Sequence, residues 1–469
     1  MKFGESKPFE AEQYQDIWEI PEGWSWISLE NAMDKVIDYR GRTPPISESG
    51  LPHLTTSNIR DGKINWETKK FVTPETYEKY MTRGIPEPGD IFFTMEGPLG
   101  EVAVLNEKRK FSLAQRILLL RPKKEIFDSR FLAYSLVCPN IRTSIDLKAT
   151  GSGVTGVAYK RLKDLQLPLP PLAEQHRIVA RVEALLSQVN AARERLSRVP
   201  LIMKKFRQAV LAAACCGRLT EGWREENLDV EPAQLILERI SRDREGFSDR
   251  KKNLIIESDF DNNFPFEIPD YWVWTQLEDV LKNPKNLSYG ILKPGDLDPD
   301  GVPMVRVMDI GDWGLNETNI VRVSPLLASQ YERTKLEVGD ILLAVMATVG
   351  RAIVVPPSLK GANVNRALAV IKLHSQIDPH YACNVIRSPY FQDTFETEKI
   401  GSAQLRINIS DLRKFSFPLP PLAEQHEIVR RVGMLFERAD AVDREIAAAG
   451  RRCERLTQAV LGKAFAGKL

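Results

Sequence analysis

Two stretches of the chain place apolar residues alternately four and three positions apart, the heptad pattern of a helix that packs against another helix. The first stretch spans residues 178–210, and the second spans residues 428–460, 250 positions later. A pair of prolines precedes each stretch, at 170–171 and at 420–421, and proline is tolerated in the first turn of a helix. We therefore expect two long helices, each of about 43 residues and roughly 65 Å.

Single residues mark where these helices should end or bend. Gly217 and Gly467 stand just beyond the two stretches, where glycine commonly closes a helix. Pro200 and Gly450 occupy equivalent places inside them. Because proline removes a backbone hydrogen bond and glycine is a weak helix former, we expect a kink or a short interruption at each place.

A heptad seam needs a partner, and the chain contains two seams of matching length. The simplest arrangement packs them on each other. Chain order favours an antiparallel pair, although the connector 217–264 is long enough to permit a parallel return. Such a pair would act as a spacer between two globular parts. The alternative is that the helices belong separately to the cores of two domains.

The heptad stretches are part of an internal repeat. The segment PLPPLAEQH at residues 168–176 recurs unchanged at 418–426. The repeat unit of 250 residues is too long for a solenoid, whose repeats have about 20–50 residues. A duplicated segment therefore predicts two similar globular domains related by a pseudo-twofold axis. The same offset, drifting by two near the start, relates Gly89–Ile91 to Gly339–Ile341, Gly151 to Gly401, Arg116 to Arg366, Gln208–Leu211 to Gln458–Leu461, and Ile20 to Ile268.

The globular parts carry the signals of mixed, strand-rich domains. A glycine–aspartate turn leads into an apolar run at 89–95 and again at 339–346, which predicts a strand in each. The predicted class is α+β, with two mixed α/β domains and two long antiparallel, coiled-coil-like helices. Further short strands are expected at 102–105, 117–121, 303–307, 352–355 and 368–373, and helices at 129–138, 232–244 and 380–387. The expected boundaries are an N-terminal segment at 1–19, a first domain at 20–167, a first helix region at 168–216, a connector at 217–264, a second domain at 265–417 and a second helix region at 418–469.

The composition fits a globular protein and limits where it could act. Of the 469 residues, 43% are hydrophobic and 27% are charged, and the net charge is only +2, so a polyanion would be held by local basic patches. The longest apolar runs stop after about nine residues, where a membrane span needs roughly 20. The beginning MKFGESKPFE lacks an apolar leader. Five cysteines without C-x-x-C spacing argue against disulfides and thiolate zinc sites. We expect a cytoplasmic protein without membrane association.

The sequence lacks the usual motifs of catalysis and metal binding. Gly151, Gly153 and Gly156 satisfy G-x-G-x-x-G, but the residues that follow lead into a proline-rich junction and not into the helix that a nucleotide site requires. Neither a G-x-x-x-x-G-K-[ST] phosphate loop nor a DPPY-like methyltransferase tetrad occurs. Three of the five histidines are scattered, and the other two, at matching helix starts, would be too far apart in an antiparallel pair to share an ion. We therefore expect no catalytic residue, no metal site and no cofactor in this chain.

With PLPPLAEQH opening a long helix twice, each time after a Gly-Ser turn, the chain resembles the specificity subunit of a Type I restriction–modification system. Tyr39–Pro44 and Tyr289-Gly290 are further matches, and the resemblance covers essentially the whole chain. It implies two target recognition domains, each reading one half of a split site in double-stranded DNA. It also implies that the helices are a spacer and a dock for two methyltransferase (modification) subunits, which motor and nuclease (restriction) subunits join. S-adenosylmethionine, ATP and Mg would then belong to those partner subunits.

Residues that could contact DNA are chosen by side-chain chemistry. Arg, Asn and Gln read base edges, whereas Lys and Arg also hold phosphates. Basic runs are often merely solvated, and Arg116 and Arg366, matched in both copies, could instead serve the shared fold. The candidates in the first domain are Ser57, Asn58, Arg60, Lys69, Lys70, Lys108, Arg109, Lys110, Gln115 and Arg116. Those in the second are Arg306, Asp309, Asn363, Asn365, Arg366, Gln404 and Arg406.

The repeated junctions are candidate docking sites for partner subunits. Because the same surface is expected twice, it should bind two identical methyltransferases. The candidates are Glu174, Gln175, His176, Glu424, Gln425 and His426. For the histidines the alternative is packing or capping in the first helical turn. Alanine at Glu174 and Gln175 should weaken one of two binding events and spare the fold.

Two other functions stay open at this point. The chain could be a DNA modification enzyme that acts alone, or a coiled-coil adaptor that does not bind DNA. The loops favour recognition, because 55–58 and 306–309 differ in residue type within a shared scaffold. Two such domains should read different half-sites of an asymmetric sequence.

Overall fold

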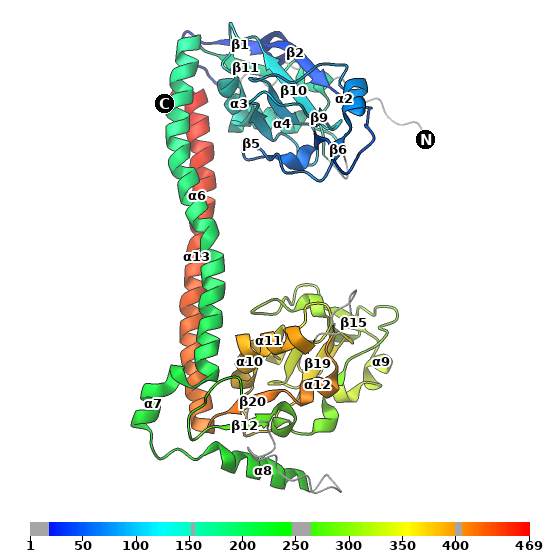
Figure 1. Cartoon of the computed structure of the whole chain (residues 1–469), viewed down its shortest axis with the longest axis vertical. Helices are drawn as coiled ribbons and strands as arrows, with labels where there is room; N and C mark the ends of the chain where they lie inside the picture. The colour runs from blue at the N-terminus through cyan, green and yellow to red at the C-terminus, as the bar shows by residue number, and fades with distance from the viewer. Residues whose placement is uncertain (1–17, 152–154, 246–263, 399–405) are drawn as a thin grey trace. The chain divides into compact units, whose positions relative to one another are not determined.

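The computed structural model describes residues 18–151, 155–245, 264–398 and 406–469 (Figure 1). These residues form two compact units. The first contains the chain up to Arg198 together with Ile446–Leu469, and the second contains Val199–Glu445. Each unit therefore holds one globular domain and a segment of each long helix.

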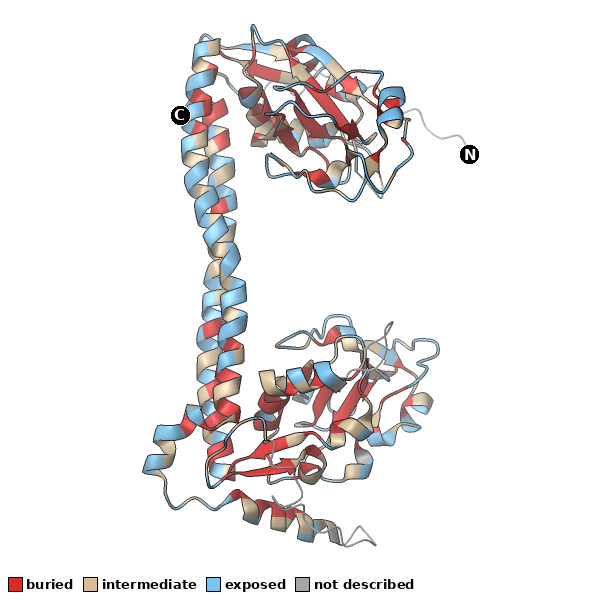
Figure 2. Ribbon diagram, viewed as in Figure 1, coloured by how far each residue is buried: buried red, intermediate tan, exposed pale blue. Residues whose placement is uncertain are grey.

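The first domain is organised around a four-stranded antiparallel sheet in the order β2-β10-β7-β8. Its strands are β2 (Met33–Asp38), β7 (Ile91–Thr94), β8 (Val102–Val104) and β10 (Ile117–Pro122). Phe92 and Leu119 pack in one apolar cluster, whereas their neighbours Phe93 and Leu120 pack in another. Because successive side chains of a strand point to opposite faces, both faces of this sheet are covered (Figure 2). This is why its strands read as continuous apolar runs.

Smaller elements cover the two faces of this sheet. The three-stranded sheet β6-β3-β9 lies on one face, and α3, α4 and the start of the first long helix lie on the other. The strands are β1 (Ser25–Ser28), β3 (Leu51–Leu54), β4 (Ile59–Arg60), β5 (Lys63–Ile64), β6 (Phe71–Val72), β9 (Ser112–Leu113) and β11 (Gln166–Leu169). The helices are α1 (Leu29–Ala32), η2 (Thr56–Asn58), α2 (Pro74–Tyr80), α3 (Ser129–Val137), α4 (Pro139–Lys148) and α5 (Tyr159–Leu162).

The second domain repeats this plan, with sheets β13-β19-β16-β17 and β15-β14-β18 and the pair β12-β20. The strands and short helices predicted from the sequence are confirmed to within a few residues. The strands are β12 (Val273–Gln276), β13 (Ser288–Tyr289), β14 (Val302–Val305), β15 (Val321–Val323), β16 (Ile341–Ala344), β17 (Ala352–Val354), β18 (Asn363–Val364), β19 (Leu368–Ile371) and β20 (Ser416–Leu419). The helices are η5 (Leu277–Val280), η6 (Pro284–Asn286), η7 (Val307–Asp309), α9 (Pro325–Ser329), η8 (Glu332–Thr334), η9 (Pro357–Leu359), α10 (Pro379–Arg387), α11 (Pro389–Glu398) and α12 (Ile409–Arg413).

The two long helices are confirmed as α6 (Leu172–Cys215) and α13 (Leu422–Phe465), each of 44 residues. In the first unit, Val182 near the start of α6 shares a core with Phe465 at the end of α13. In the second unit, Leu211 near the end of α6 shares a core with Ile428 near the start of α13. The helices therefore run antiparallel, as predicted.

The short interruptions expected at Pro200 and Gly450 are wrong, whereas the kinks expected there stay a prediction. Helix α6 runs unbroken through Pro200, and α13 runs unbroken through Gly450. Pro200 is exposed, so solvent can satisfy the carbonyl group that loses its partner. The packed seam residues before and after Pro200 hold α6 in a continuous helix. Some seam positions are nevertheless exposed, among them Ala192, Val442 and Leu456.

The connector after α6 packs on the second domain. It forms η3 (Arg218–Thr220), α7 (Glu221–Glu226) and α8 (Ala233–Glu245), the last close to the predicted helix at 232–244. Ile236 and Ile240 of α8 are buried in the core of the second unit together with Trp272. Within the described ranges, every helix is too short or too polar to cross a lipid bilayer.

Candidate nucleic-acid interface and helix junctions

Gln175 lies in the first turn of α6 and is fully buried. Its Oε1 accepts a hydrogen bond from the backbone N–H of Asp128 at 2.9 Å, and its Nε2 donates to the carbonyl groups of Ile126 at 2.7 Å and Pro170 at 3.0 Å. One amide side chain thus ties the helix start to the loop that precedes α3.

Gln425 holds the same position in the second domain and is also fully buried. Its Oε1 accepts from the N–H of Asp378 at 2.8 Å, and its Nε2 donates to the carbonyl of Pro420 at 3.0 Å. The prediction that Gln175 and Gln425 contact a partner is therefore wrong, because neither side chain reaches the surface. They are fold-stabilising residues, and removing Gln175 would not spare the fold.

Glu424 is also fully buried, so its predicted role as a partner contact is wrong too. Its carboxylate accepts hydrogen bonds from Trp272 Nε1 at 2.7 Å, Thr220 Oγ1 at 2.6 Å and Arg224 Nη1 at 2.5 Å. Thr220 and Arg224 come from the connector after α6. The connector therefore closes this junction around a compensated charge.

Glu174, the repeat equivalent of Glu424, has a different environment. Its side chain is 30% exposed and pairs with Arg177 on the same helix, at 2.7 Å and 2.8 Å. The hydrogen bonds from Arg177 lower the pKa of the Glu174 carboxyl group. The same sequence at the two junctions thus gives an accessible ion pair in one domain and a buried charge cluster in the other.

The junction histidines remain at the surface. The side chain of His176 is 58% exposed and lies 3.6 Å from the Asp128 carboxylate, and that of His426 is 62% exposed and lies 3.8 Å from Asp378. Of the six junction candidates, Glu174, His176 and His426 are accessible to a partner.

Strand pairing shows which positions of the two domains correspond. In the first domain Ile117 of β10 pairs with Thr94 of β7. In the second domain Leu368 of β19 pairs with Ala344 of β16. Thr94 and Ala344 are 250 residues apart, but Ile117 and Leu368 are 251 apart. One residue has therefore been gained between these strands in the second copy.

This shift corrects the equivalence of Arg116 with Arg366. In the loops that precede β10 and β19, Gln115 corresponds to Arg366, and Arg116 corresponds to Ala367. Arginine is therefore not retained at one position, and the suggestion that this pair serves the shared fold loses its basis. The loop position of Gln115 and Arg366 instead differs between the copies.

Asn58 and Asp309 were candidates for reading bases, but both are buried, with 5% and 4% exposure. Asn58 Oδ1 accepts from the N–H of Thr55 at 2.9 Å, and its Nδ2 donates to the carbonyl of Asn65. Asp309 Oδ2 accepts from the N–H of Arg306 at 2.8 Å. Both side chains close equivalent 3₁₀ turns, so direct contact with bases is wrong for them.

Asn363 is likewise occupied within the fold, with 1% exposure. Its Nδ2 donates to the carbonyl of Ala328 at 3.1 Å, and its Oδ1 accepts from Thr334 Oγ1 at 2.9 Å. Asn365 is half-buried, and its Oδ1 accepts from the N–H of Ala367 at 3.3 Å. The prediction that Asn363 reads a base is therefore wrong.

Several cationic candidates have partners inside the chain. Arg306 donates to Asp309 at 2.9 Å, and this carboxylate raises the pKa of the guanidinium group. Arg109 lies over the ring of Trp66 at 4.5 Å. Further contacts join Arg60 to the carbonyls of Thr56 and Ile59, Arg109 to Glu107, Lys110 to Glu78 and Arg116 to Glu96. The uncharged candidate Ser57 contacts Thr55.

Other candidates are exposed and have no such contact. Lys69, Lys70, Lys108, Arg366 and Arg406 are exposed at the surface. No hydrogen bond or ion pair of these five side chains occurs in the parts of the chain that the structure describes. Gln404 lies outside the described residues.

A hollow of about 360 Å³ lies in the first domain, lined by Arg42, His53, Thr55, Lys70, Gln115 and Arg116, among others. Burial and the nearby charge of Lys70 lower the pKa of His53 to about 4, so this ring is uncharged at neutral pH. The hollow therefore combines three cations with neutral polar groups. Arg42 was not a candidate, although its position within Tyr39–Pro44 could have indicated it.

A family comparison identifies the family of the chain. The model of the Type I restriction modification DNA specificity domain matches residues 45–199 and 269–446. The chain belongs to this specificity family. Its membership agrees with the duplicated fold, because the model matches once in each half.

Relatives along the whole chain are specificity subunits. The chain is 29% identical over 469 residues to the Type I restriction enzyme EcoBI specificity subunit of Escherichia coli, with 99% of this chain and 90% of the relative covered. It is 28% identical over 464 residues to the EcoKI specificity subunit of Escherichia coli (strain K12), with 96% and 90% covered. These names place the chain with the targeting subunits of restriction enzymes, which are not themselves catalytic.

A solved structure supports the fold of this specificity-family chain. A chain from a structure described as showing complex assembly and conformational transition of the type I R-M system superposes with a TM-score of 0.65. The identity is 21%, and the match covers 96% of this chain and 100% of the other. The architecture of two mixed domains and two long helices is therefore that of the family.

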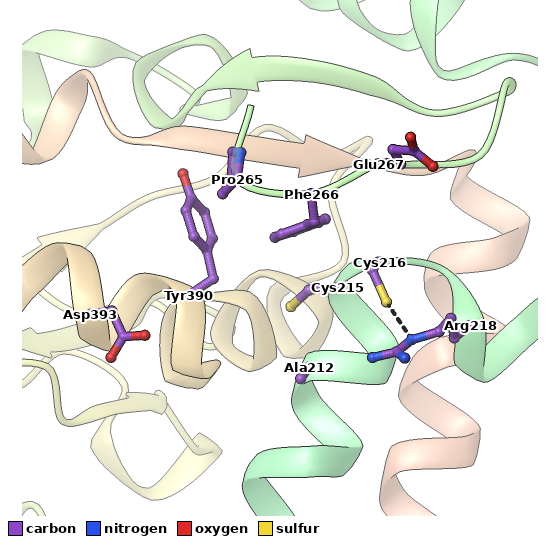
Figure 3. Close-up of a pocket in the computed structure, with 9 residues that line it drawn as sticks. All are labelled: Ala212, Cys215, Cys216, Arg218, Pro265, Phe266, Glu267, Tyr390 and Asp393. Atoms are coloured by element: carbon purple, nitrogen blue, oxygen red, sulfur yellow. Dashed lines mark hydrogen bonds between the residues drawn. The ribbon is translucent and has the colours of Figure 1, made fainter. Parts of the chain in front are cut away.

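A second hollow, of about 580 Å³, lies in the second unit near the end of α6 (Figure 3). Arg218 Nε donates to Cys216 Sγ at 3.1 Å there, and burial raises the pKa of the neighbouring Cys215 thiol to about 12. Glu267 and Asp393 also line it. Among the described residues of this specificity-family chain, no group of three or more His, Cys, Asp or Glu side chains is placed to hold a metal ion.

The role of Gln175 in the junction leads to a stability prediction. Replacing Gln175 with alanine leaves the N–H of Asp128 and the carbonyls of Ile126 and Pro170 without partners, so the free energy of unfolding should fall by about 2–4 kcal/mol. His176→Ala, on the exposed face of the same turn, should cost less than about 1 kcal/mol. Urea unfolding of the two variants measures the difference. Equal losses would contradict the assignment.

Proposed function

We propose that the chain is the DNA-reading specificity subunit of a Type I restriction–modification complex, and that each domain reads one half of a split, asymmetric site. The observation that carries this proposal is the contrast between scaffold and loops. The two domains share their sheets and turns, yet equivalent loop positions hold different polar residues, Thr55 against Arg306 and Gln115 against Arg366. Side chains that differ on one scaffold should read different bases.

We further propose that the two junctions dock two copies of one methyltransferase subunit. The support is that each junction presents an exposed histidine beside an aspartate of its own domain, His176 with Asp128 and His426 with Asp378. Motor and nuclease subunits would join this core. S-adenosylmethionine, ATP and Mg would be bound by those partners, and the complex would act in the cytoplasm.

The composition of the complex tests the docking proposal. Native mass measurement of the chain co-purified with its methyltransferase should give two methyltransferases for each chain. His176→Ala and His426→Ala should each weaken one of the two binding events, because each removes one of two equivalent contacts. A one-to-one complex of the intact proteins would contradict the proposal.

Duplex retention tests DNA recognition itself. The complex should retain a labelled duplex in a gel, and the retention should weaken steeply between about 50 and 200 mM salt because phosphate contacts release counterions. A coiled-coil adaptor would retain none. Methyl transfer by the purified chain alone would instead favour a modification enzyme that needs no partner.

A further inference from the structure

A three-residue loop occupies the same place in both domains. It links β9 to β10 in the first domain as residues 114–116, and β18 to β19 in the second as residues 365–367. The strands at both ends are held in matching pairs. Leu54 pairs with Leu113 in the first domain, and Val305 pairs with Val364 in the second. The loop is therefore presented by a rigid frame from two sheets.

The middle position of this loop is the one with a free polar side chain in both copies. Gln115 is half-buried and Arg366 is exposed. Neither side chain forms a hydrogen bond or ion pair with any residue in the described ranges. At the first loop position, Ala114 of the first domain has no polar side chain, and the side chain of Asn365 in the second domain binds the loop backbone. At the third loop position, Arg116 of the first domain pairs with Glu96, and its counterpart Ala367 in the second domain has no polar side chain.

The electrostatics around Gln115 favour a polyanion. Arg42, Lys70 and Arg116 line the same hollow as Gln115, and His53, which also lines it, is uncharged at neutral pH. Arg116 pairs with Glu96, whereas Arg42 and Lys70 form no ion pair within the described residues. Arg42 donates to Thr82 Oγ1 at 2.9 Å and so keeps its charge available. Phosphates drawn to these cations would bring base edges to the loop.

The two side chains have different recognition chemistry. A glutamine amide donates and accepts at once, which matches N6 and N7 of adenine in the major groove. An arginine guanidinium group donates twice, which matches O6 and N7 of guanine. Three other polar candidates, Asn58, Asp309 and Asn363, are buried and satisfied within the fold.

We propose that Gln115 and Arg366 are equivalent specificity-determining residues. Gln115 reads an A·T pair in the half-site of the first domain, and Arg366 reads a G·C pair in the half-site of the second. This inference rests on the proposed function and adds which residues divide the specificity.

Exchange of the two side chains tests the inference. The complex with its methyltransferase is expressed in a host without DNA methylation, and the methylated motif is mapped for the wild type, Gln115→Arg and Arg366→Gln. Each variant should change one base pair of one half-site and leave the other half intact. Gln115→Ala and Arg366→Ala should relax that position, lowering discrimination against the wrong base by about 10- to 100-fold.

A matched control and the wild type separate the possible failures. Lys69→Ala, an exposed cation in the first domain, should weaken DNA retention without changing the motif. Circular dichroism confirms folding of each variant. If the wild type methylates no specific motif, the proposed function fails. If the wild-type motif is clear but stays unchanged in all four loop variants, or changes in both halves at once, the inference alone is overturned.

Discussion

Replacing Glu424 with alanine is expected to lower the free energy of unfolding of the second unit by about 3–5 kcal/mol, because it removes one partner of a buried ion pair. The Glu424 carboxylate is fully buried, and Arg224 is 18% exposed. Without Glu424, Trp272 Nε1 loses its acceptor, and the guanidinium group of Arg224 loses its buried counter-charge and keeps only the hydroxyl group of Thr220, at 3.1 Å. Thr220 Oγ1 keeps only the carbonyl of Gly217, at 3.4 Å. The connector would then be held to the start of α13 by fewer contacts, one of which is the hydrogen bond from Arg431 Nη1 to the carbonyl of Leu219 at 2.8 Å.

The internal repeat supplies the matched control for this experiment. Glu174→Ala removes the same residue from the same nine-residue segment, but its ion pair with Arg177 is solvated, so the cost should stay below about 1 kcal/mol. Calorimetry of both variants measures the two losses, and hydrogen exchange of α7 should rise in Glu424→Ala only. Similar losses in the two variants would show that the buried cluster does not stabilise the second unit.

Exchange of the first domain for another recognition domain is expected to change one half of the methylated motif completely and leave the other half unchanged. Each domain has its own sheets and its own loops, so under the proposed function neither should depend on the other for its contacts with bases. The structure improves the boundaries of the exchange. Strand β11 begins at Gln166 and pairs with β1, so the transferred segment should run from residue 20 to residue 170 and keep this pair together.

The donor domain must also fit the junction that remains. Its loop before α3 must offer a backbone N–H and a carbonyl group to Gln175, as Asp128 and Ile126 do. A donor that lacks this loop serves as the control, because it should fold poorly without altering the second half of the motif. If a well-folded exchange altered both halves, the division of labour between the domains would be wrong.

The long helices could be predicted because their pattern is local and periodic. The heptad seam and the two proline pairs at 170–171 and 420–421 depend only on neighbouring residues. Helix α6 also continues through Pro200, although the rule that proline interrupts a helix did not predict this. An exposed carbonyl can be solvated, and the packed segments on both sides outweigh the loss of one hydrogen bond.

The junction roles could not be predicted, because they depend on segments that meet only in the folded chain. Glu174 and Glu424 lie in identical sequence, yet only Glu424 is enclosed by Thr220 and Arg224 of the connector. The one signal in the sequence that the two junctions could differ was that the connector follows the first long helix and not the second. Gln175, an amide in a first helical turn, resembles a surface residue until its loop partners are known.

The candidate interface was predicted in part. The sequence pointed to the loop position of Gln115 and Arg366, but a single inserted residue hid their equivalence until strand pairing showed it. Polar residues that close turns, such as Asn58 and Asp309, have the same chemistry as base readers. Only burial separates the two roles, and burial is a property of the fold.

Methylation mapping of the host genome, with the gene for this chain present and after its deletion, tests the central claim most directly. The account predicts one methylated motif made of two unlike half-sites separated by bases of any sequence, and it predicts that both halves lose methylation together in the deletion strain. A continuous palindrome, or a motif that persists after the deletion, would contradict it.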